Sequence, residues 1–365
     1  MEKKAVKALM LLPNLRPSNG VSTFAMNYFR RLDHDLIHID FALYSDRETP
    51  YYDEIKSISN SKIYILENVK KIDKHMKQCR RILLEGNYDV IHDNTLLISW
   101  PMMHEAQKMG IPVRILHSHN SVLGETRLKL IRNKAFLPLL KCTVNRYAAC
   151  GDLAGRAMFG NKSFSLIPNI IDEKRYVFDG LRREIIRKEN DVEKKQVILT
   201  VGRTAEQKNP FFAIDIIEEL NQTYHDFEYW WIGSGPLDTR LKEYVELKGL
   251  KNVVRLFGSK NNIIDYYQAA DAFFLPSKFE GLALVMIEAQ AMGLPCVISD
   301  VITDEVIYTD LVKQCSLQKA PSEWALILKG VLCNKTNRYN YNEILKHSIY
   351  SSENAQETFL ALYSH

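Results

Sequence analysis

Two glutamates eight positions apart, Glu280 and Glu288, have the residue type and surroundings of a ligand-binding pair. Glu280 precedes the expected helix Leu282–Met292, and Glu288 lies two turns inside it among apolar residues. A carboxylate buried on so apolar a helix needs hydrogen-bond donors. Sugar hydroxyls are suitable donors because an ionised carboxylate only accepts; a buried salt bridge to Arg or Lys is the structural alternative. Gly281 permits close backbone approach, and the free N–H groups of the helix start favour an anion.

Two cations, Arg203 and Lys208, follow the expected strand Val197–Val201 and precede Pro210, which can open a helix. Fixed cations beside a helix N-terminus suit a diphosphate, and a pair of solvated surface cations is the alternative. The loop Gly233-Ser-Gly235 after a later strand lacks the third glycine of a dinucleotide loop. A tight strand-to-helix turn is therefore favoured there over direct phosphate contact.

The first half of the chain offers a glycine and two histidines. Gly20 follows the first strand and allows close ligand approach, while Ser22 is expected to cap the next helix. His117 and His119 end a later strand and share one of its faces. They could contact a substrate, form hydrogen bonds in the core, or bind a metal. A metal site is the least favoured, because no Asp, Glu or Cys nearby supplies an obvious third ligand.

These residues need parallel sheets to position them. Short apolar segments alternate with longer segments of helical character, which predicts α/β domains with helices on both sheet faces. Ligands bind beyond the carboxyl ends of such strands, where the residues above lie. Strands are expected at 7–12, 39–44, 62–65, 89–92, 113–117, 197–201, 229–232, 253–257, 272–275 and 296–299.

The length of 365 residues suits two domains. We expect a first domain at 1–170, a second at 171–350, and a C-terminal helix at 351–365 that can pack back on the first. The charged segment 173–195 is interpreted as a linker with a short helix.

The composition is that of a soluble globular protein, with 46% apolar and 25% charged residues. The six cysteines show no zinc spacing, which is typical of reduced thiols in a cytosolic protein. No apolar run reaches the roughly 18 residues of a membrane span. The apolar start of the chain is interpreted as a strand rather than a signal peptide. A cytoplasmic location is expected.

The charge is unevenly placed along the chain. Residues 1–170 hold 25 Lys/Arg against 16 Asp/Glu, a net +9, and the remainder holds 23 against 28, a net −5. A basic first half favours an anionic partner such as a membrane surface or a phosphate-bearing substrate. The basic, partly apolar segment 127–141 suits a peripheral contact with an anionic membrane as well as an ordinary solvated helix face. Nucleic acid is disfavoured, because no recognised binding module is present.

Taken together, these segments resemble family 4 glycosyltransferases of the GT-B fold, in the bacterial capsular and exopolysaccharide branch. The match runs over nearly the whole chain, through NGVSTF, YDVIHDN, IPVRILHSHN, IPNIID, VGRTAEQKNP, WWIGSGPL, VVRLFGS and ADAFFLPSKFEGLALVMIEAQAMGLPCVISD. The resemblance implies two Rossmann-like doubly wound α/β domains facing a cleft. Two departures are Asn19 in place of the first glycine of the usual Gly-Gly pair and Ala283 in place of a proline. Neither removes a charged or hydrogen-bonding group.

The family implies a role for each matching position. Arg203 and Lys208 would bind the donor diphosphate, and Glu288 would hold the ribose hydroxyls. Glu280 would contact the donor sugar, with the backbone of Gly281, Leu282, Ala283 and Leu284. Phe257 and Gly258 would flank the base, and Gly20 would meet the diphosphate from the other domain. His119 is favoured as the histidine near the reacting carbon, with His117 left open.

The resemblance also implies retaining, metal-independent sugar transfer without a cofactor. The expected donor is a UDP-sugar carrying a hexose or N-acetylhexosamine, and the expected acceptor is a polyprenyl-diphosphate-linked saccharide. Charge developing on the departing diphosphate would be stabilised by Arg203 and Lys208. Our hypothesis for the reaction is front-face attack. The alternatives are a sugar-nucleotide epimerase of the same fold and an inactive binding partner in a polysaccharide assembly complex.

Overall fold

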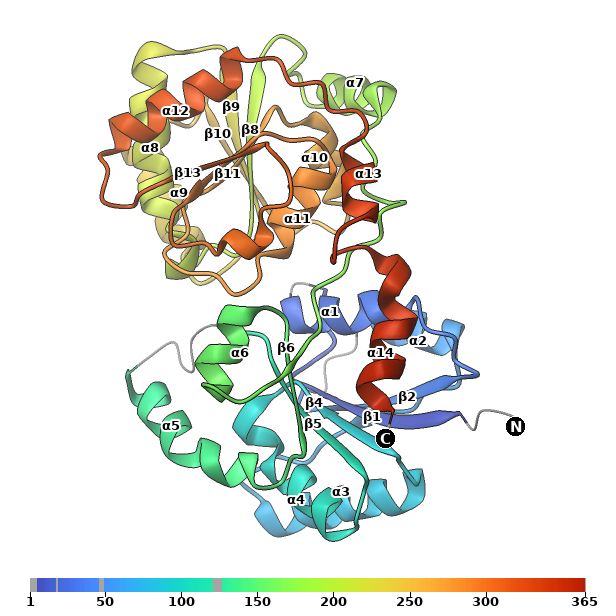
Figure 1. Ribbon diagram of the computed structural model, residues 1–365. Coiled ribbons are helices and arrows are strands. Elements are labelled where there is room, and N and C mark those ends of the chain that lie inside the picture. Colours follow the sequence, from blue (N-terminus) through green and yellow to red (C-terminus); the bar gives the residue numbers. More distant parts are fainter. Residues whose placement is uncertain (1–4, 18, 46–48, 121–126, 365) are drawn as a thin grey trace. The chain divides into compact units, whose positions relative to one another are not determined.

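The computed structural model describes residues 5–17, 19–45, 49–120 and 127–364, without the side chains of Arg127 and Lys129 (Figure 1). The chain divides into two compact units. The first unit comprises residues 1–170 together with 352–365, and the second comprises residues 171–351. Each unit is an α/β domain built on its own parallel sheet.

The described residues of the first unit form a sheet of seven parallel strands in the order β3-β2-β1-β4-β5-β6-β7. The central β1 is buried from Ala8 to Leu12, as a parallel strand covered on both faces should be. The strands are β1 Val6–Leu12, β2 Ile37–Leu43, β3 Ile63–Ile65, β4 Val90–Asp93, β5 Val113–Ser118, β6 Arg146–Ala149 and β7 Ser165–Leu166.

Helices cover both faces of this sheet. Apolar residues of α1, α2 and α14 pack with Ala8, Met10 and Leu12 of β1 in one core cluster. The helices α3, α4 and α5 lie side by side on the other face (Figure 1). The helices of this unit are α1 Gly20–Phe29, α2 Pro50–Ile58, α3 Ile72–Gly86, η1 Leu96–Ser99, α4 Trp100–Lys108, α5 Arg127–Lys141, α6 Asp152–Phe159, η4 Ser352–Asn354 and α14 Ala355–Tyr363.

The described residues of the second unit form a sheet of six parallel strands in the order β10-β9-β8-β11-β12-β13. Val197, Leu199 and Val201 of β8 face one core cluster and Ile198 faces the other, which is the period-two alternation of a strand. The strands are β8 Gln196–Val201, β9 Phe227–Ile232, β10 Val254–Gly258, β11 Ala272–Leu275, β12 Cys296–Ser299 and β13 Val312–Cys315.

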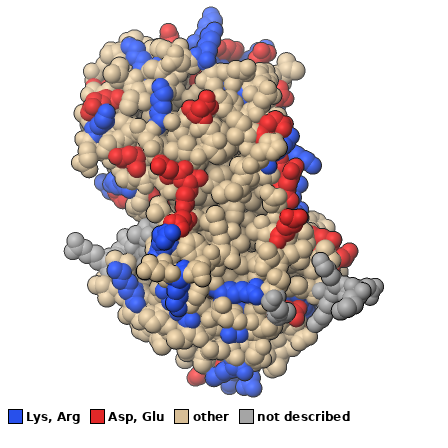
Figure 2. All heavy atoms as spheres, in the orientation of Figure 1, with Lys and Arg blue, Asp and Glu red and all other residues tan. Residues whose placement is uncertain are grey.

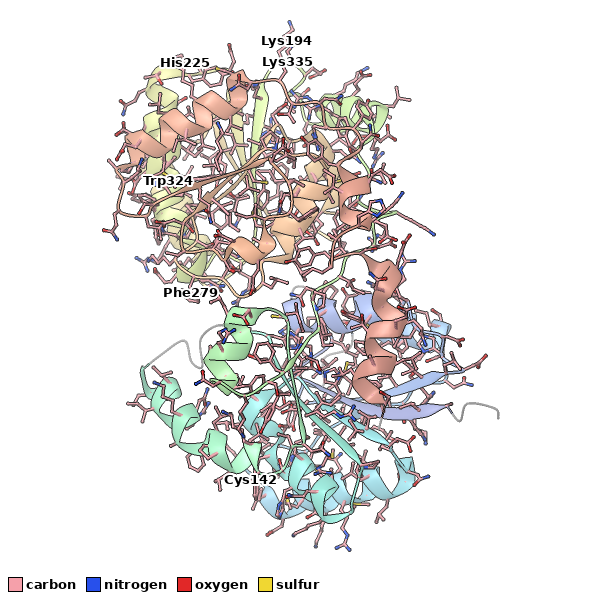
Figure 3. The ribbon with its side chains drawn as sticks, viewed as in Figure 1. Cys142, Lys194, His225, Phe279, Trp324 and Lys335 are labelled. Carbon is pink, nitrogen blue, oxygen red and sulfur yellow. The ribbon has the colours of Figure 1, made fainter. Side chains whose placement is uncertain are left out.

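The two core clusters of the second unit each have their own helices. One cluster takes residues from α7, α10, α11 and α13, and the other from α8, α9 and α12. Trp324 of α12, labelled in Figure 3, is fully buried, with Phe212 of α8 edge-on to its ring. The helices are α7 Gly180–Glu189, η2 Glu206–Lys208, α8 Pro210–Thr223, α9 Asp238–Leu247, α10 Ile264–Ala269, α11 Leu284–Ala291, η3 Asp304–Val306, α12 Pro321–Cys333 and α13 Tyr341–Lys346.

The segment 173–195, interpreted as a linker with a short helix, does contain that helix but is an integral part of the second unit. It contains α7, which packs against α10. Arg183 and Arg187 of α7 donate to the carbonyl oxygens at the end of α10 and pair with Asp271 at 2.5 and 2.9 Å. These two arginines cap unsatisfied carbonyls at a helix C-terminus and so tie α7 to the second unit.

The last helix, α14, belongs to the first unit although it follows the second in the chain. Phe359, Leu362 and Tyr363 are buried in the core cluster of the first unit, and Phe359 stacks on Tyr28 of α1. Ser351, which we had grouped with this helix, instead pairs with Ile171 in the second unit.

Each sheet reverses its strand order once at its centre, between β1 and β4 in the first unit and between β8 and β11 in the second. The loops at the carboxyl ends of such neighbouring strands diverge to opposite faces and leave a crevice that suits a ligand. Gly20 follows β1, Arg203 and Lys208 follow β8, and Glu280 follows β11, whereas the two histidines belong to β5 and its end, and Phe257 and Gly258 belong to β10.

Candidate functional site

Lys208 and Glu280 meet beyond the carboxyl ends of β8 and β11, at the switch point of the second sheet. Lys208 Nζ lies 2.6 Å from Glu280 Oε1, and the two side chains are only 12% and 6% exposed. Gln207 Nε2 donates to Glu280 Oε2 at 3.1 Å. A pair this sheltered from solvent holds its geometry, because removing either partner would leave an uncompensated buried charge.

The loops that carry this pair are tied together by their backbones. The N–H of Lys278 donates to the carbonyl oxygen of Gln207 at 2.8 Å. Gly202 makes room for the lysine, because a Cβ at that position would lie 2.8 Å from Lys208 Cε. A side chain at position 202 would therefore press on the Lys208 chain where it crosses the turn after β8.

Arg203 lies in the loop between β8 and α8, five positions before Lys208, and is exposed. Among the described residues, no Asp or Glu forms an ion pair with its guanidinium. Pro210 opens α8, and Asn209 before it adopts the left-handed conformation with φ of 55°. The loop after β8 thus carries a solvent-accessible cation and the lysine of a sheltered ion pair, and two such cations can receive an anionic ligand.

The start of α11 lies in the same loop as Glu280. The helix begins at Leu284, after Gly281, Leu282 and Ala283. Ala283 has φ of −73°, a value that proline also adopts, so the alanine found here keeps the backbone path of the usual proline. The exposed aromatic Phe279, labelled in Figure 3, immediately precedes Glu280.

Glu288 is buried inside α11 at 5% exposure, with neutral partners. Tyr176 donates to its Oε1 and Tyr267 to its Oε2, each at 2.8 Å. The sequence left a buried salt bridge as the structural alternative for Glu288. Among the described residues, no Lys or Arg forms an ion pair with this carboxylate. Burial raises the pKa of Glu288, and the two tyrosine hydrogen bonds oppose that rise.

Phe257 and Gly258 lie at the carboxyl end of β10, two strands away from β8. Gly258 has φ of 66° at a register irregularity of the strand. The N–H of Gly233 donates to the Gly258 carbonyl at 2.8 Å. A Cβ on Gly233 would lie 2.2 Å from the carbonyl oxygen of Gly202. Gly233 therefore serves close packing of these loops, in line with the tight turn favoured from the sequence.

In the first unit, Gly20 begins α1 and is exposed, and a Cβ built on it meets nothing within 4 Å. Close approach of a ligand backbone or phosphate is therefore open there. The expected cap, Ser22, is wrong: Asn19 caps the helix by accepting from the N–H groups of Val21 and Ser22 at 3.0 and 3.2 Å. The Ser22 hydroxyl instead donates to the carbonyl of Asn14 at 2.8 Å. Asparagine is as good an N-cap as serine, and it stands directly before the first helical residue.

The two histidines of β5 and its end have different surroundings. His119 keeps some surface exposure, and its Nε2 lies 2.8 Å from Asn94 Oδ1. His117 is buried, and its Nδ1 lies 3.0 Å from Nε2 of His92. Burial lowers the pKa of His119 to about 3 and that of His117 well below its usual value. Both rings are therefore neutral hydrogen-bonding groups near pH 7. In the described part of the chain, no group of three or more His, Cys, Asp or Glu side chains is arranged to hold a metal ion.

Several partners of these residues were missed from the sequence. Tyr176, Tyr267 and Gln207 hold the two glutamates, and His92 and Asn94 hold the histidines. Asn94 stands in the YDVIHDN segment and could have been suspected there. The sequence does not indicate the role of the two tyrosines. Tyr267 has the pattern of an ordinary core residue, and Tyr176 lies 112 positions from Glu288.

A model of the family described as glycosyl transferases group 1 matches residues 182–344. This chain contains a group 1 glycosyltransferase domain. The matched range takes in nearly the whole second unit, including Arg203, Lys208, Glu280 and Glu288.

Curated relatives extend the similarity of this chain beyond that domain. A putative glycosyltransferase, EpsF of Bacillus subtilis, is 28% identical and covers 94% of this chain and 93% of its own. The capsular polysaccharide biosynthesis glycosyltransferase CapH of Staphylococcus aureus is 25% identical over 78% of this chain and 79% of its own. A UDP-Gal:alpha-D-GlcNAc-diphosphoundecaprenol alpha-1,3-galactosyltransferase of Escherichia coli is 25% identical over 60% of each chain.

Solved structures show the same fold. The crystal structure of Anabaena HepE in complex with UDP and glucose is similar to this chain with a TM-score of 0.83. The alignment covers 99% of this chain and 100% of HepE at 15% sequence identity. The two Rossmann-like α/β domains expected from the resemblance are therefore confirmed as the fold.

Proposed function

We propose that this glycosyltransferase transfers a sugar from a UDP-sugar to a polyprenyl-diphosphate-linked saccharide in capsular or exopolysaccharide synthesis, with retention of anomeric configuration and without a metal ion. The observation that carries the proposal is the sheltered Lys208–Glu280 pair at the switch point of the second sheet, with exposed Arg203 in the same loop as Lys208.

The leaving group decides what this site must do. When the bond between the sugar and the nucleoside diphosphate breaks, negative charge grows on the phosphate oxygens. Arg203, Lys208 and the N–H groups at the start of α11 stabilise that charge more than they stabilise the intact donor, which is what lowers a barrier. Fixed cations take the place that a metal ion would otherwise have.

Glu280 acts on the sugar in this proposal. In the contact described above, it neutralises Lys208 and accepts from Gln207. When a diphosphate binds, Lys208 has a second anion with which to pair. The Glu280 carboxylate can then accept a hydrogen bond from a sugar hydroxyl. It is a donor-sugar contact rather than a nucleophile, so retention follows from front-face attack, with the leaving phosphate accepting the proton of the acceptor.

Support for the donor and acceptor comes from the relatives. HepE was crystallised with UDP and glucose, and the Escherichia coli relative is named for UDP-Gal and for a diphosphoundecaprenol-linked acceptor. CapH is named for capsular polysaccharide biosynthesis. We assign the remaining expected residues by the family resemblance alone: Glu288 to the ribose, Phe257 and Gly258 to the base, Gly20 to the phosphates and His119 to the sugar.

A lipid-linked acceptor would bring the protein to a membrane surface, and α5 is the element that we propose meets it. Its residues 127–141 contain five Lys or Arg and no Asp or Glu. Leu128, Ile131, Phe136 and Leu139 are 53–82% exposed and lie opposite its buried side. Figure 2 shows Lys and Arg side chains gathered over the first unit on the face that it draws. No described helix is long and apolar enough to cross a membrane.

Vesicle flotation tests the membrane contact. Leu128→Ser/Ile131→Ser should lose most of its binding to vesicles containing anionic lipid, and neither this variant nor the natural protein should bind neutral vesicles. Leu326→Ser, at a position on α12 that is 72% exposed, is the matched control. Equal binding by all three proteins would contradict the assignment of α5.

The transfer reaction is tested with UDP-glucose, UDP-galactose and UDP-N-acetylglucosamine, each with a polyprenyl-diphosphate-linked saccharide and EDTA. The proposal expects a glycosylated lipid whose new linkage keeps the anomeric configuration of the donor. Interconversion of sugar nucleotides without acceptor would identify an epimerase instead. Binding without transfer or hydrolysis would identify an inactive partner. A thermal-shift panel of UDP, GDP and ADP selects the base, because a ligand at 100 times its Kd adds about 2.7 kcal/mol, a shift of several degrees.

A further inference from the structure

The carboxylate of Glu288 is held from three separate elements of the second unit. Tyr176 precedes α7, Tyr267 lies on α10, and Glu288 itself lies on α11. The tyrosine rings meet edge to face with centroids 6.3 Å apart, and each hydroxyl reaches a different carboxylate oxygen at 2.8 Å. The Val285 carbonyl lies 3.3 Å from the Tyr267 hydroxyl, but a charged acceptor at the shorter distance takes its single proton.

The chemistry of the partners matters as much as their number. The pKa of Tyr267 is raised well above its usual value, chiefly by burial, so the hydroxyl stays protonated and donates. The positive charge of Arg175 acts on Glu288 at longer range and lowers its pKa. A directly paired arginine would occupy both carboxylate oxygens with a bidentate contact, whereas each tyrosine takes one lone pair of one oxygen.

An ionised carboxylate accepts about four hydrogen bonds, two on each oxygen. With one tyrosine on each oxygen, Glu288 keeps one accepting direction per oxygen. Two acceptors side by side on one rigid group fit two donors on neighbouring carbons, which is a vicinal diol. The ribose of a nucleotide carries such a diol in its 2′- and 3′-hydroxyls.

We propose that Tyr176 and Tyr267 are positioning residues that hold the Glu288 carboxylate to accept both ribose hydroxyls of the donor nucleotide. This inference rests on the proposed nucleotide-sugar site and adds to it two residues that touch no substrate. Fixing the carboxylate before the ligand arrives removes the side-chain ordering that binding would otherwise cost.

The test compares a nucleoside diphosphate with its 2′,3′-dideoxy counterpart by calorimetry, using whichever of UDP, GDP or ADP gives the largest thermal shift. Tyr176→Phe and Tyr267→Phe keep the rings and remove the hydroxyls. Each should weaken binding of the ribonucleotide by about tenfold and leave binding of the dideoxynucleotide unchanged. Tyr229→Phe is the matched control, because Tyr229 is fully buried in the same unit and its hydroxyl contacts Thr200 instead.

If a tyrosine variant unfolds, Glu288→Gln replaces it in the test. This variant should also bind the ribonucleotide more weakly and the dideoxynucleotide as well as the natural protein does. The positioning role is overturned if folded Tyr176→Phe and Tyr267→Phe keep the full preference for the ribonucleotide, or if Glu288→Gln keeps it. A natural protein that transfers sugar but binds both nucleotides equally overturns this inference and leaves the proposed function standing. A natural protein that binds none of the nucleotides overturns both.

Discussion

The Lys208–Glu280 contact places two opposite charges 2.6 Å apart with little solvent around them. At the residue scale this pair differs from its neighbour Lys278–Glu206, whose side chains are 47% and 64% exposed. Exposed pairs contribute little to stability because water already solvates both ions. A sheltered pair has lost that solvation, so each charge depends on the other. The two pairs offer a comparison within one loop region.

Lys208→Met should cost about 3–5 kcal/mol of unfolding free energy, because it removes the cation that neutralises Glu280. Lys208→Met/Glu280→Gln should recover most of that loss, since neither residue is then charged, yet it should remain inactive in transfer. Urea unfolding and turnover assays measure the two effects. Lys278→Met, the control, should cost less than about 1 kcal/mol. A double variant as unstable as the single one would contradict this account of the pair.

Arg203→Ala should lower kcat by about 10²–10³-fold with little change in stability, because the exposed guanidinium stabilises charge that develops only in the transition state. Steady-state transfer assays and a melting curve check both parts. Arg240→Ala, at an exposed position of α9 in the same unit, should leave kcat unchanged. Full activity in Arg203→Ala would remove Arg203 from the proposed mechanism.

At the element scale, the carboxyl ends of β4 and β5 bring together three histidines, of which His92 and His117 are buried and His119 is partly exposed. The rings of His92 and His117 stack with centroids 5.2 Å apart, and those of His117 and His119 at 4.1 Å. Nδ1 of His92 lies 2.9 Å from the Tyr363 hydroxyl of α14. Burial lowers the pKa of His92 and of His119 to about 3. The folded first unit therefore keeps these rings uncharged where an unfolded chain would protonate them.

Acid should selectively weaken the first unit. All three histidines have a folded pKa below the unfolded value near 6.5, so their stabilising effect is present above pH 6.5; for His92 and His119 it is lost as pH falls toward about 3. Between these two pKa values, each such histidine lowers the free energy of unfolding by about 1.4 kcal/mol for every pH unit of acidification. Urea unfolding at pH 7.5, 6.5 and 5.5 can follow both units by circular dichroism. Tryptophan fluorescence reports mainly the second unit, which holds Trp230, Trp231 and Trp324.

The circular dichroism transition should therefore split below pH 6.5, with its early part absent from the fluorescence. If the circular dichroism and fluorescence transitions coincide at pH 5.5, the three histidines are protonated in the folded state or are freely solvated. His347→Gln, at an exposed histidine of the second unit, should leave the pH dependence unchanged and serves as the control.

Most strands and helices near the site were predictable because their apolar pattern is local. The strands at 272–275 and 296–299 have the predicted bounds. Others gave no comparable signal: β7 has two residues, the edge strand β13 reads VKQC, and α7 is dominated by charged residues. Edge strands bury less and so carry less apolar pattern. The role of α7 became visible only through the carbonyl oxygens that Arg183 and Arg187 cap.

At the scale of the whole molecule, the chain leaves the first unit at Ile170 and returns to it at Ser352. The last helix then completes a core built mainly from residues 8–55. The stability of the first unit thus depends on the end of the chain, after the second unit has been made. A helix of nine residues is marginal alone, so α14 depends on this packing for its own structure.

Phe359→Ala should destabilise the first unit by about 3–5 kcal/mol, because the ring is fully buried and its removal leaves a cavity. The second unit should be unaffected. Urea unfolding followed by circular dichroism and by tryptophan fluorescence separates the two effects. Leu326→Ala, at a position 72% exposed, should change neither by more than about 0.5 kcal/mol. A Phe359→Ala protein that unfolds like the natural one would contradict the packing of α14.

The sequence by itself determined the α/β class, the parallel sheets and the loops that hold Arg203, Lys208, Glu280 and Glu288. Those features are local, because apolar periodicity sets the strands and glycines mark the turns after them. Only the tertiary structure decided the partners: Lys208 with Glu280 across 72 positions, and Tyr176 with Glu288 across 112. A buried charge requires a neutralising or hydrogen-bonding neighbour, but the chain can bring that neighbour from any element. The sequence predicts that a buried charge needs a partner, whereas tertiary packing determines which residue is that partner.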